Sequence, residues 1–108
     1  LITERGSQFG YNELVVDFKG IPVMQCFAPV IMDVTHSLQR TNQKNGITAG
    51  QPELIETIAK AAIASGVDGI FLETHPDTSQ AKSDGANMLP LNKLEDILQK
   101  LVKIKKAL

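Results

Sequence analysis

The sequence predicts an α/β fold built on parallel strands. Three short apolar runs, beginning near Leu1, Pro29 and Gly69, each lead into polar or ionisable residues. A continuous apolar run fits a strand that is buried on both faces, as in a parallel sheet. Because α/β proteins usually place ligands at the carboxyl ends of parallel strands, we expect the three strand ends to converge on one site.

The first predicted strand covers residues 1–5, and the third covers residues 69–76. The second follows Pro29, and its apolar run leads into Asp33, Thr35 and His36 at the carboxyl end. A helix is expected over 52–65, because Pro52 suits a first helical position and Gly66 a helix stop.

A last helix is expected over 91–107, where apolar residues recur on one face. Residues 17–25 predict a short, irregular helical stretch. The polar segment 37–51 is long for a connection and leaves directly from the second strand end, which favours a lid or binding loop over a passive surface loop. Residues 76–90 are expected to form a second polar loop.

Composition excludes several classes of protein. The chain has 108 residues and a net charge of −1, with no basic block to favour nucleic acid or an anionic membrane. No apolar run approaches the ~20 residues of a membrane span. The single cysteine, Cys26, fits a reducing compartment, and we expect a buried structural thiol rather than a catalytic one.

Ionisable side chains at the predicted strand ends could carry chemistry. His36, Glu73 and Asp84 offer one imidazole and two carboxylates, a set that suits zinc, iron or manganese. His75 follows closely, and Arg5 could hold a phosphate or carboxylate with two N–H groups. Spacing alone leaves the plainer alternatives open, namely a hydrogen-bonded histidine and an arginine in a salt bridge.

Four blocks of sequence carry a family resemblance. They are TERGSQFGYNELVVD (3–17), DVTHSLQ (33–39), FLETHPD (71–77) and SDG with LPL (83–85 and 89–91). Together and in this order they closely resemble the 3-deoxy-D-manno-octulosonate 8-phosphate synthases, and they cover nearly the whole chain. The related deoxy-heptulosonate phosphate synthases match these blocks less well.

The resemblance implies a (β/α)8 TIM barrel, of which residues 1–108 would be the C-terminal three βα units within a single domain. Three such units cannot close an eight-stranded barrel, and the sequence has no initiator Met, so we expect an incomplete chain that is not active alone. The implied reaction condenses phosphoenolpyruvate, D-arabinose 5-phosphate and water. It yields the eight-carbon sugar acid phosphate and phosphate, in lipopolysaccharide biosynthesis.

The resemblance also implies roles for individual residues. Arg5 matches the arginine that binds the phosphate of phosphoenolpyruvate, and His36, Glu73 and Asp84 match three of four metal ligands. We therefore expect His36 and Asp84 to be catalytic, and Arg5 and His36 to bind substrate. The fourth ligand is a cysteine near the family's N-terminus, which an asparagine replaces in the metal-independent branch. It has no counterpart here, since Cys26 does not match it.

Residues 84–88 look closer to the metal-dependent branch, for which the resemblance implies a divalent zinc, iron or manganese cofactor. The metal-independent branch, which needs no cofactor, stays open. Residues 39–50 match a loop that covers the sugar phosphate. The family further implies a cytoplasmic homotetramer. Two alternatives stay open, a non-catalytic anion-binding barrel fragment and a related synthase that takes another aldose phosphate.

Overall fold

The computed structural model describes residues 1–8, 12–40 and 49–108 of the chain. The predicted lid falls largely on residues 41–48, which lie outside the described residues. Among the described helices, none is both long enough and apolar enough to cross a membrane.

A parallel sheet forms the centre of the molecule. Within the described ranges it joins β1 (Ile2–Glu4), β4 (Val30–Asp33) and β5 (Gly69–Phe71) in the order β1-β4-β5. Ile2 pairs with Val30, and Ile31 pairs with Gly69. The prediction of neighbouring parallel strands is therefore confirmed, and β4 lies between the other two.

β4 is the buried strand that its unbroken apolar run predicts. Val30 and Met32 are fully buried within it, and Val34 is fully buried just beyond it. Burial of such side chains contributes about 1.5–3 kcal/mol each relative to exposure. The segment that carries the polar residues after Asp33 is thus anchored by the best-packed strand of the sheet.

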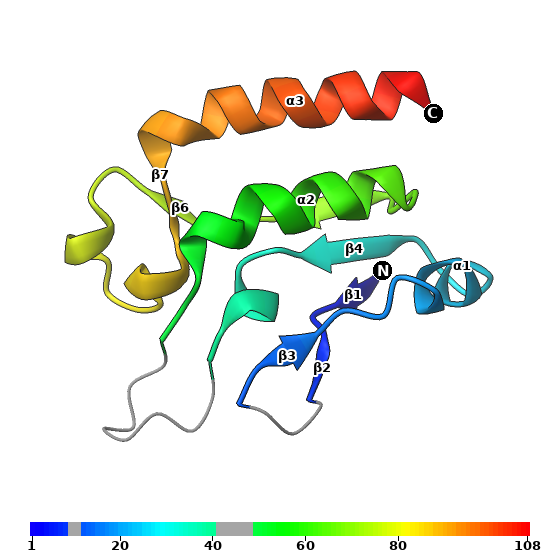
Figure 1. Ribbon diagram of the computed structural model, residues 1–108, viewed down its shortest axis with the longest axis horizontal. Coiled ribbons are helices and arrows are strands. Elements are labelled where there is room, and N and C mark those ends of the chain that lie inside the picture. Colours follow the sequence, from blue (N-terminus) through cyan, green and yellow to red (C-terminus); the bar gives the residue numbers. More distant parts are fainter. Residues whose placement is uncertain (9–11, 41–48) are drawn as a thin grey trace.

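Two helices lie side by side over this sheet (Figure 1). α2 (Ile55–Ala64) follows a 3-10 turn at Pro52–Leu54, and α3 (Leu94–Ala107) follows a 3-10 turn at Leu91–Lys93. The predicted helices are confirmed, except that the first turn of each is a 3-10 turn instead of an α-helical one. Gly66 ends α2 with φ at +93°, a left-handed conformation that glycine adopts without strain.

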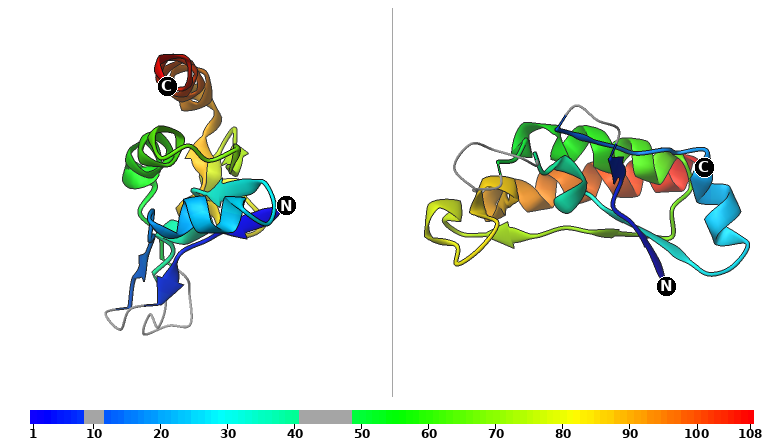
Figure 2. Two further views of the ribbon diagram at one scale, coloured as in Figure 1. Left: turned by 90° about the vertical axis from the view of Figure 1, so that its right-hand side faces the viewer. Right: turned by 90° about the horizontal axis from the view of Figure 1, so that it is seen from below.

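The predicted helical stretch 17–25 is shorter in the structure, where α1 covers Gly20–Gln25. It packs against β4 and buries Ile21 completely. The views in Figure 2 place it at the end of the molecule that holds both termini. β2 (Ser7–Gln8) and β3 (Leu14–Val15) form an antiparallel pair that the sequence did not predict.

The expectation of a buried thiol at Cys26 is wrong. The side chain is exposed, and its Sγ donates a hydrogen bond to the Pro22 carbonyl oxygen, one turn earlier, at 3.4 Å. Its apolar neighbour Phe27 is also exposed, so α1 turns this end of its surface to solvent. The apolar residues around Cys26 suggested a core that does not form there.

The third predicted strand ends earlier than expected. β5 stops at Phe71, and the chain then pairs β6 (Thr74–His75) with β7 (Leu89–Pro90) in a separate parallel pair. The backbone N–H of Glu73 donates to Thr35 Oγ1 at 2.8 Å rather than continuing the ladder. Residues 76–90 are consequently not a simple loop, because they return as β7.

Candidate metal and anion site

The candidate site lies at the carboxyl ends of the parallel strands. His36 begins a 3-10 turn (His36–Leu38) three residues beyond β4, and Glu73 lies two residues beyond β5. Asp84 comes from the segment that precedes β7, and Arg5 directly follows β1. The predicted convergence of these segments at one edge of the sheet is therefore observed.

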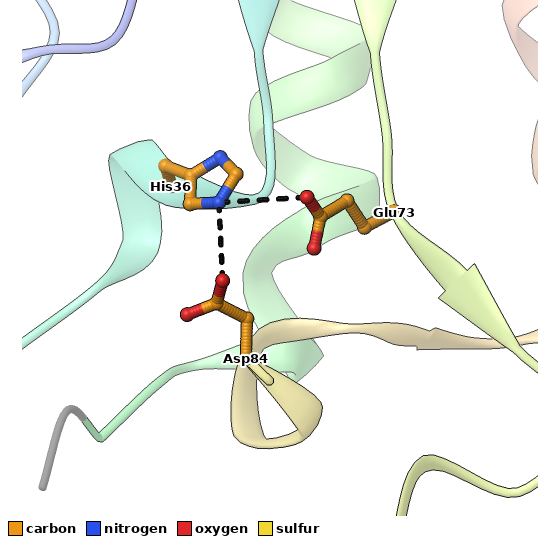
Figure 3. Close-up of side chains that lie close together, drawn as sticks. All are labelled: His36, Glu73 and Asp84. Carbon is orange, nitrogen blue, oxygen red and sulfur yellow. Dashed lines mark ion pairs between the residues drawn. The ribbon is translucent and has the colours of Figure 1, made fainter. Parts of the chain in front are cut away.

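Three side chains meet at this edge (Figure 3). His36 Nε2 lies 3.6 Å from Glu73 Oε1 and 3.6 Å from Asp84 Oδ2. One ligand atom from each residue falls within 4.8 Å of the other two. The three side chains are partly buried, so the cluster is open to solvent on one side.

Asp33 holds the imidazole of His36 from the opposite side. Asp33 Oδ2 lies 2.8 Å from His36 Nδ1, and Asp33 Oδ1 accepts the backbone N–H groups of Thr35 and His36. The Asp33 side chain is only 7% exposed. A carboxylate that accepts Nδ1–H leaves the lone pair on Nε2, the nitrogen that faces Glu73 and Asp84.

Backbone contacts fix Glu73 and Asp84. Glu73 is tied through its N–H to Thr35 and through its carbonyl oxygen to the N–H of Leu89 at 3.0 Å. Asp84 has φ 54° and ψ 17°, a left-handed conformation that aspartate tolerates better than most residues. Its carbonyl oxygen accepts the N–H of Asn87 at 2.8 Å.

Arg5 reaches this cluster through Gln39. Arg5 Nη2 donates to Gln39 Oε1 at 2.8 Å, and Gln39 Nε2 donates to Asp84 Oδ1 at 3.1 Å. Gln39 is 8% exposed, whereas Arg5 is exposed. The guanidinium therefore stands beside the cluster with donors available to an anion, without forming an ion pair with Asp84.

The donor set fits a divalent cation. A histidine with a free Nε2 and two carboxylates is a ligand set typical of zinc and of other first-row metals. Ligands about 2.1 Å from a tetrahedral metal lie about 3.4 Å apart, close to the separations from His36 Nε2. Asp33 supplies the carboxylate that commonly supports a metal-bound histidine.

The structure brings together His36, Glu73 and Asp84, and places Arg5 one side chain away. It separates His75, whose Nδ1 accepts the N–H of Asp77 at 2.9 Å.

Two site residues were missed from the sequence, Asp33 and Gln39. Both lie three residues from His36, and this spacing, which places side chains on one side of a turn, was the available signal.

A parallel sheet with helices packed on it and polar ligand groups at its carboxyl edge places the chain in the class of α/β proteins, which includes the α/β barrels. Within this class, the chain belongs to the DAHP synthetase I family, whose model matches residues 1–108.

Curated relatives and solved structures support this family assignment. The chain is 51% identical over 109 residues to the 2-dehydro-3-deoxyphosphooctonate aldolase of Koribacter versatilis (strain Ellin345), with 98% of this chain and 39% of that protein matched. The protein of that name from Desulfotalea psychrophila is 50% identical over 108 residues, covering 99% of this chain and 39% of its own length. The resemblance drawn from the sequence is thus confirmed.

A crystal structure of phospho-2-dehydro-3-deoxyheptonate aldolase (DAHP synthase) from Thermotoga maritima superposes with a TM-score of 0.79 at 28% identity, over 97% of this chain and 29% of that one. A truncated 3-deoxy-D-arabino-heptulosonate 7-phosphate synthase from the same organism gives 0.78 at 28% identity, over 97% and 37%. The chain thus spans about two fifths of the length of its curated relatives. The α/β fold is that of part of a TIM barrel.

Proposed function

We propose that the chain is part of a synthase that condenses phosphoenolpyruvate with D-arabinose 5-phosphate and water. The products are 3-deoxy-D-manno-octulosonate 8-phosphate and phosphate, in lipopolysaccharide biosynthesis. Sequence identity of 50–51% to proteins named 2-dehydro-3-deoxyphosphooctonate aldolase supports this reaction. The observation that carries the proposal is the convergence of His36, Glu73 and Asp84 beside Arg5 at the carboxyl edge of the sheet. Residues 1–108 would be the C-terminal portion of a single barrel domain.

Arg5 is assigned to the phosphate of phosphoenolpyruvate. Its guanidinium is exposed at the strand edge, and only Nη2 is engaged in a hydrogen bond with a described side chain, that of Gln39. Arginine presents its remaining N–H groups as a fork that matches two oxygens of a phosphate. A phosphate bound there would lie on the same edge as His36, so Arg5 would orient the three-carbon substrate toward the cluster.

His36, Glu73 and Asp84 are assigned to a divalent cation of the zinc, iron or manganese class. When bound, such an ion supplies Lewis acidity that activates a water or orients the sugar aldehyde. Asp33 holds His36 so that Nε2 faces the two carboxylates. His36 and Asp84 would be catalytic, because both would border the reacting atoms.

Between heavy atoms the net chemistry forms two σ bonds and breaks one, while the C=C of phosphoenolpyruvate and the C=O of the aldehyde become single bonds and C2 becomes a carbonyl. One proton of the water ends on the former aldehyde oxygen and the other on the departing phosphate. Water attacks C2 of phosphoenolpyruvate, C3 attacks the aldehyde carbon of the sugar, and inorganic phosphate leaves from C2. The family resemblance further supports a cytoplasmic homotetramer.

The test is a turnover assay on the complete gene product that contains this chain. An eight-carbon acid requires a five-carbon aldose phosphate once phosphoenolpyruvate has supplied three carbons. We expect phosphate release with arabinose 5-phosphate and Mn²⁺, loss of activity on chelation, and recovery when metal is restored. If chelation leaves turnover unchanged, the assignment of a metal to His36, Glu73 and Asp84 is wrong.

The same assay separates the alternatives. The second candidate is a synthase that takes another aldose phosphate, such as a four-carbon one. The likeness to heptulosonate synthases at 28% identity is consistent with it, but the relatives at about 50% identity do not favour it. Faster turnover with that sugar would replace our assignment of the substrate. Binding of phosphoenolpyruvate without turnover of either sugar would favour a non-catalytic anion-binding protein.

A further inference from the structure

Gln39 stands between the anion-binding and cation-binding parts of the site. Its Oε1 accepts from Arg5 and its Nε2 donates to Asp84, at 2.8 and 3.1 Å. These partners are 34 and 45 residues away along the chain. The turn that presents His36 also holds Gln39, whose backbone N–H donates to the His36 carbonyl oxygen at 3.2 Å.

The two neighbours fix the orientation of the Gln39 amide. A guanidinium has only donors, and an ionised carboxylate has only acceptors. The amide oxygen must therefore face Arg5, and the amide N–H must face Asp84. The reversed amide would oppose donor to donor and acceptor to acceptor in a nearly buried position, where unpaired polar groups are costly.

The amide in turn selects the carboxylate oxygen that Asp84 presents to His36. Gln39 engages Oδ1, and Oδ2 is the oxygen that lies 3.6 Å from His36 Nε2. Rotation about the last side-chain bond of an aspartate is otherwise broad. Without Gln39, the carboxylate would sample orientations in which neither oxygen is aimed at His36.

We propose that Gln39 is a positioning residue that couples Arg5 to Asp84, since Arg5 fixes the amide and the amide aims the carboxylate at the cation cluster. The inference rests on the proposed assignment of a divalent cation to that cluster. A neutral amide transmits orientation without neutralising Asp84, whereas a direct Arg5–Asp84 ion pair would compete with the cation for the carboxylate.

The test measures Co²⁺ affinity by visible absorption in the metal-free complete gene product. Gln39→Met retains side-chain length and removes both hydrogen bonds, and we expect Co²⁺ affinity to fall by about 10- to 100-fold, as for other groups that orient metal ligands. Arg5→Met removes the group that orients the amide, and we expect a loss of roughly 3-fold or more.

Three further variants separate coupling from general loosening. The double variant Arg5→Met/Gln39→Met should bind Co²⁺ as Gln39→Met does, because Arg5 acts through the amide. Arg5→Lys keeps a cationic donor and should retain Co²⁺ affinity while weakening the binding of inorganic phosphate. Gln99→Met makes the same chemical change on the exposed face of α3 and should alter neither.

The outcomes are distinguishable. If the unmodified protein binds no Co²⁺, the metal assignment in the proposed function falls, and this inference falls with it. If it binds Co²⁺ and a folded Gln39→Met variant binds equally well, only the inference is overturned. Additive losses in the double variant also overturn it. Gln39→Leu replaces Gln39→Met if circular dichroism shows that the latter does not fold.

Discussion

The molecule has one charged cluster at the carboxyl edge of the sheet and another on the helices α2 and α3. The two clusters differ in the ratio of negative to positive side chains. At the edge of the sheet, Asp33, Glu73 and Asp84 surround one histidine. In the helical layer, charges of opposite sign alternate between α2 and α3. The members of that helical cluster are Glu56, Lys60, Asp96 and Lys100.

In the helical cluster, each charged side chain forms an ion pair with a side chain of opposite charge. Lys100 Nζ lies 3.0 Å from Glu56 and 2.7 Å from Asp96, while Lys60 pairs with Glu56 at 2.5 Å. Hydrogen bonds from Lys60 and Lys100 hold the pKa of Glu56 below its usual value of 4.5. At the sheet edge, by contrast, carboxylates outnumber cationic partners. An excess of negative charge that the described residues do not neutralise supports the proposed binding of a cation, whereas the balanced pairs connect two helices.

The largest expected effect is at His36. His36→Ala removes the group on which both carboxylates converge, so metal affinity should collapse and kcat/KM should fall by about 10³-fold or more, the upper scale for loss of one positioned electrostatic contact. Metal content and steady-state turnover of the complete gene product provide the measurement.

The matched control for this variant is His75→Ala. His75 accepts a hydrogen bond from the Asp77 N–H and lies outside the cluster. Equal losses from the two variants would show that histidine removal damages the fold rather than a site.

Arg5→Ala should follow, with a loss of at least ~10²-fold in kcat/KM, because a positioned charge for the substrate phosphate is removed. Most of the loss should appear as a raised KM for phosphoenolpyruvate. Lys103→Ala removes a cation from exposed α3 and should leave KM unchanged. An unaltered kcat/KM in Arg5→Ala would refute the assignment of this residue.

Asp33→Asn should have an intermediate effect. The amide is not a charged partner for Nδ1, so His36 loses the carboxylate that holds its ring with Nε2 toward Glu73 and Asp84. We expect metal affinity to fall by about 10- to 100-fold. Competition with a chromophoric chelator measures it, and Asp77→Asn, in an exposed turn, is the control. Equal affinities for both variants would argue against a role for Asp33.

The smallest effect is expected in the helical cluster, and it should depend on pH and salt. Glu56 stabilises the fold above pH 4.5, and this contribution is lost as pH falls through its lowered folded-state pKa. Hydrogen bonds with Asp96 and Glu56 raise the pKa of Lys100 above 10.5, so its contribution is present below that pH and is lost as pH rises further. Between these limits the contribution should be constant.

Thermal unfolding of Glu56→Gln across this pH range provides the measurement. The difference from the unmodified protein should shrink in 1 M salt, where the screening length is about 3 Å. Metal affinity should be unchanged. A difference that persists at a pH below the lowered folded-state pKa of Glu56, where both proteins carry neutral side chains at position 56, would point to packing instead of charge.

The sequence was sufficient for the parts of the fold governed by periodicity. The apolar run of β4 and the helical spacing of α2 and α3 predicted those elements. The convergence of His36 and Glu73 followed from parallel strands, whose carboxyl ends share one edge. Asp84 was a candidate from its residue type, but no periodicity placed it at that edge, and the family resemblance strengthened its assignment.

Other features depend on contacts that no local pattern encodes. β6 and β7 are two residues each, too short for any alternation, and they pair across 15 residues of chain. Gln39 was assigned to a loop, because its partners Arg5 and Asp84 lie 34 and 45 residues away along the chain. Cys26 was misjudged because local apolar composition does not reveal which side of a short helix meets the core.

The left-handed backbone at Asp84 restricts which amino acids the position can hold. Glycine and asparagine fit that conformation, but neither supplies a negative charge, while β-branched side chains would be strained there. Glutamate retains the charge, but it is less enriched than aspartate in the left-handed region. Two independent demands, one chemical and one conformational, therefore leave a single natural side chain suited to this position, and drift there should be slower than at Glu73.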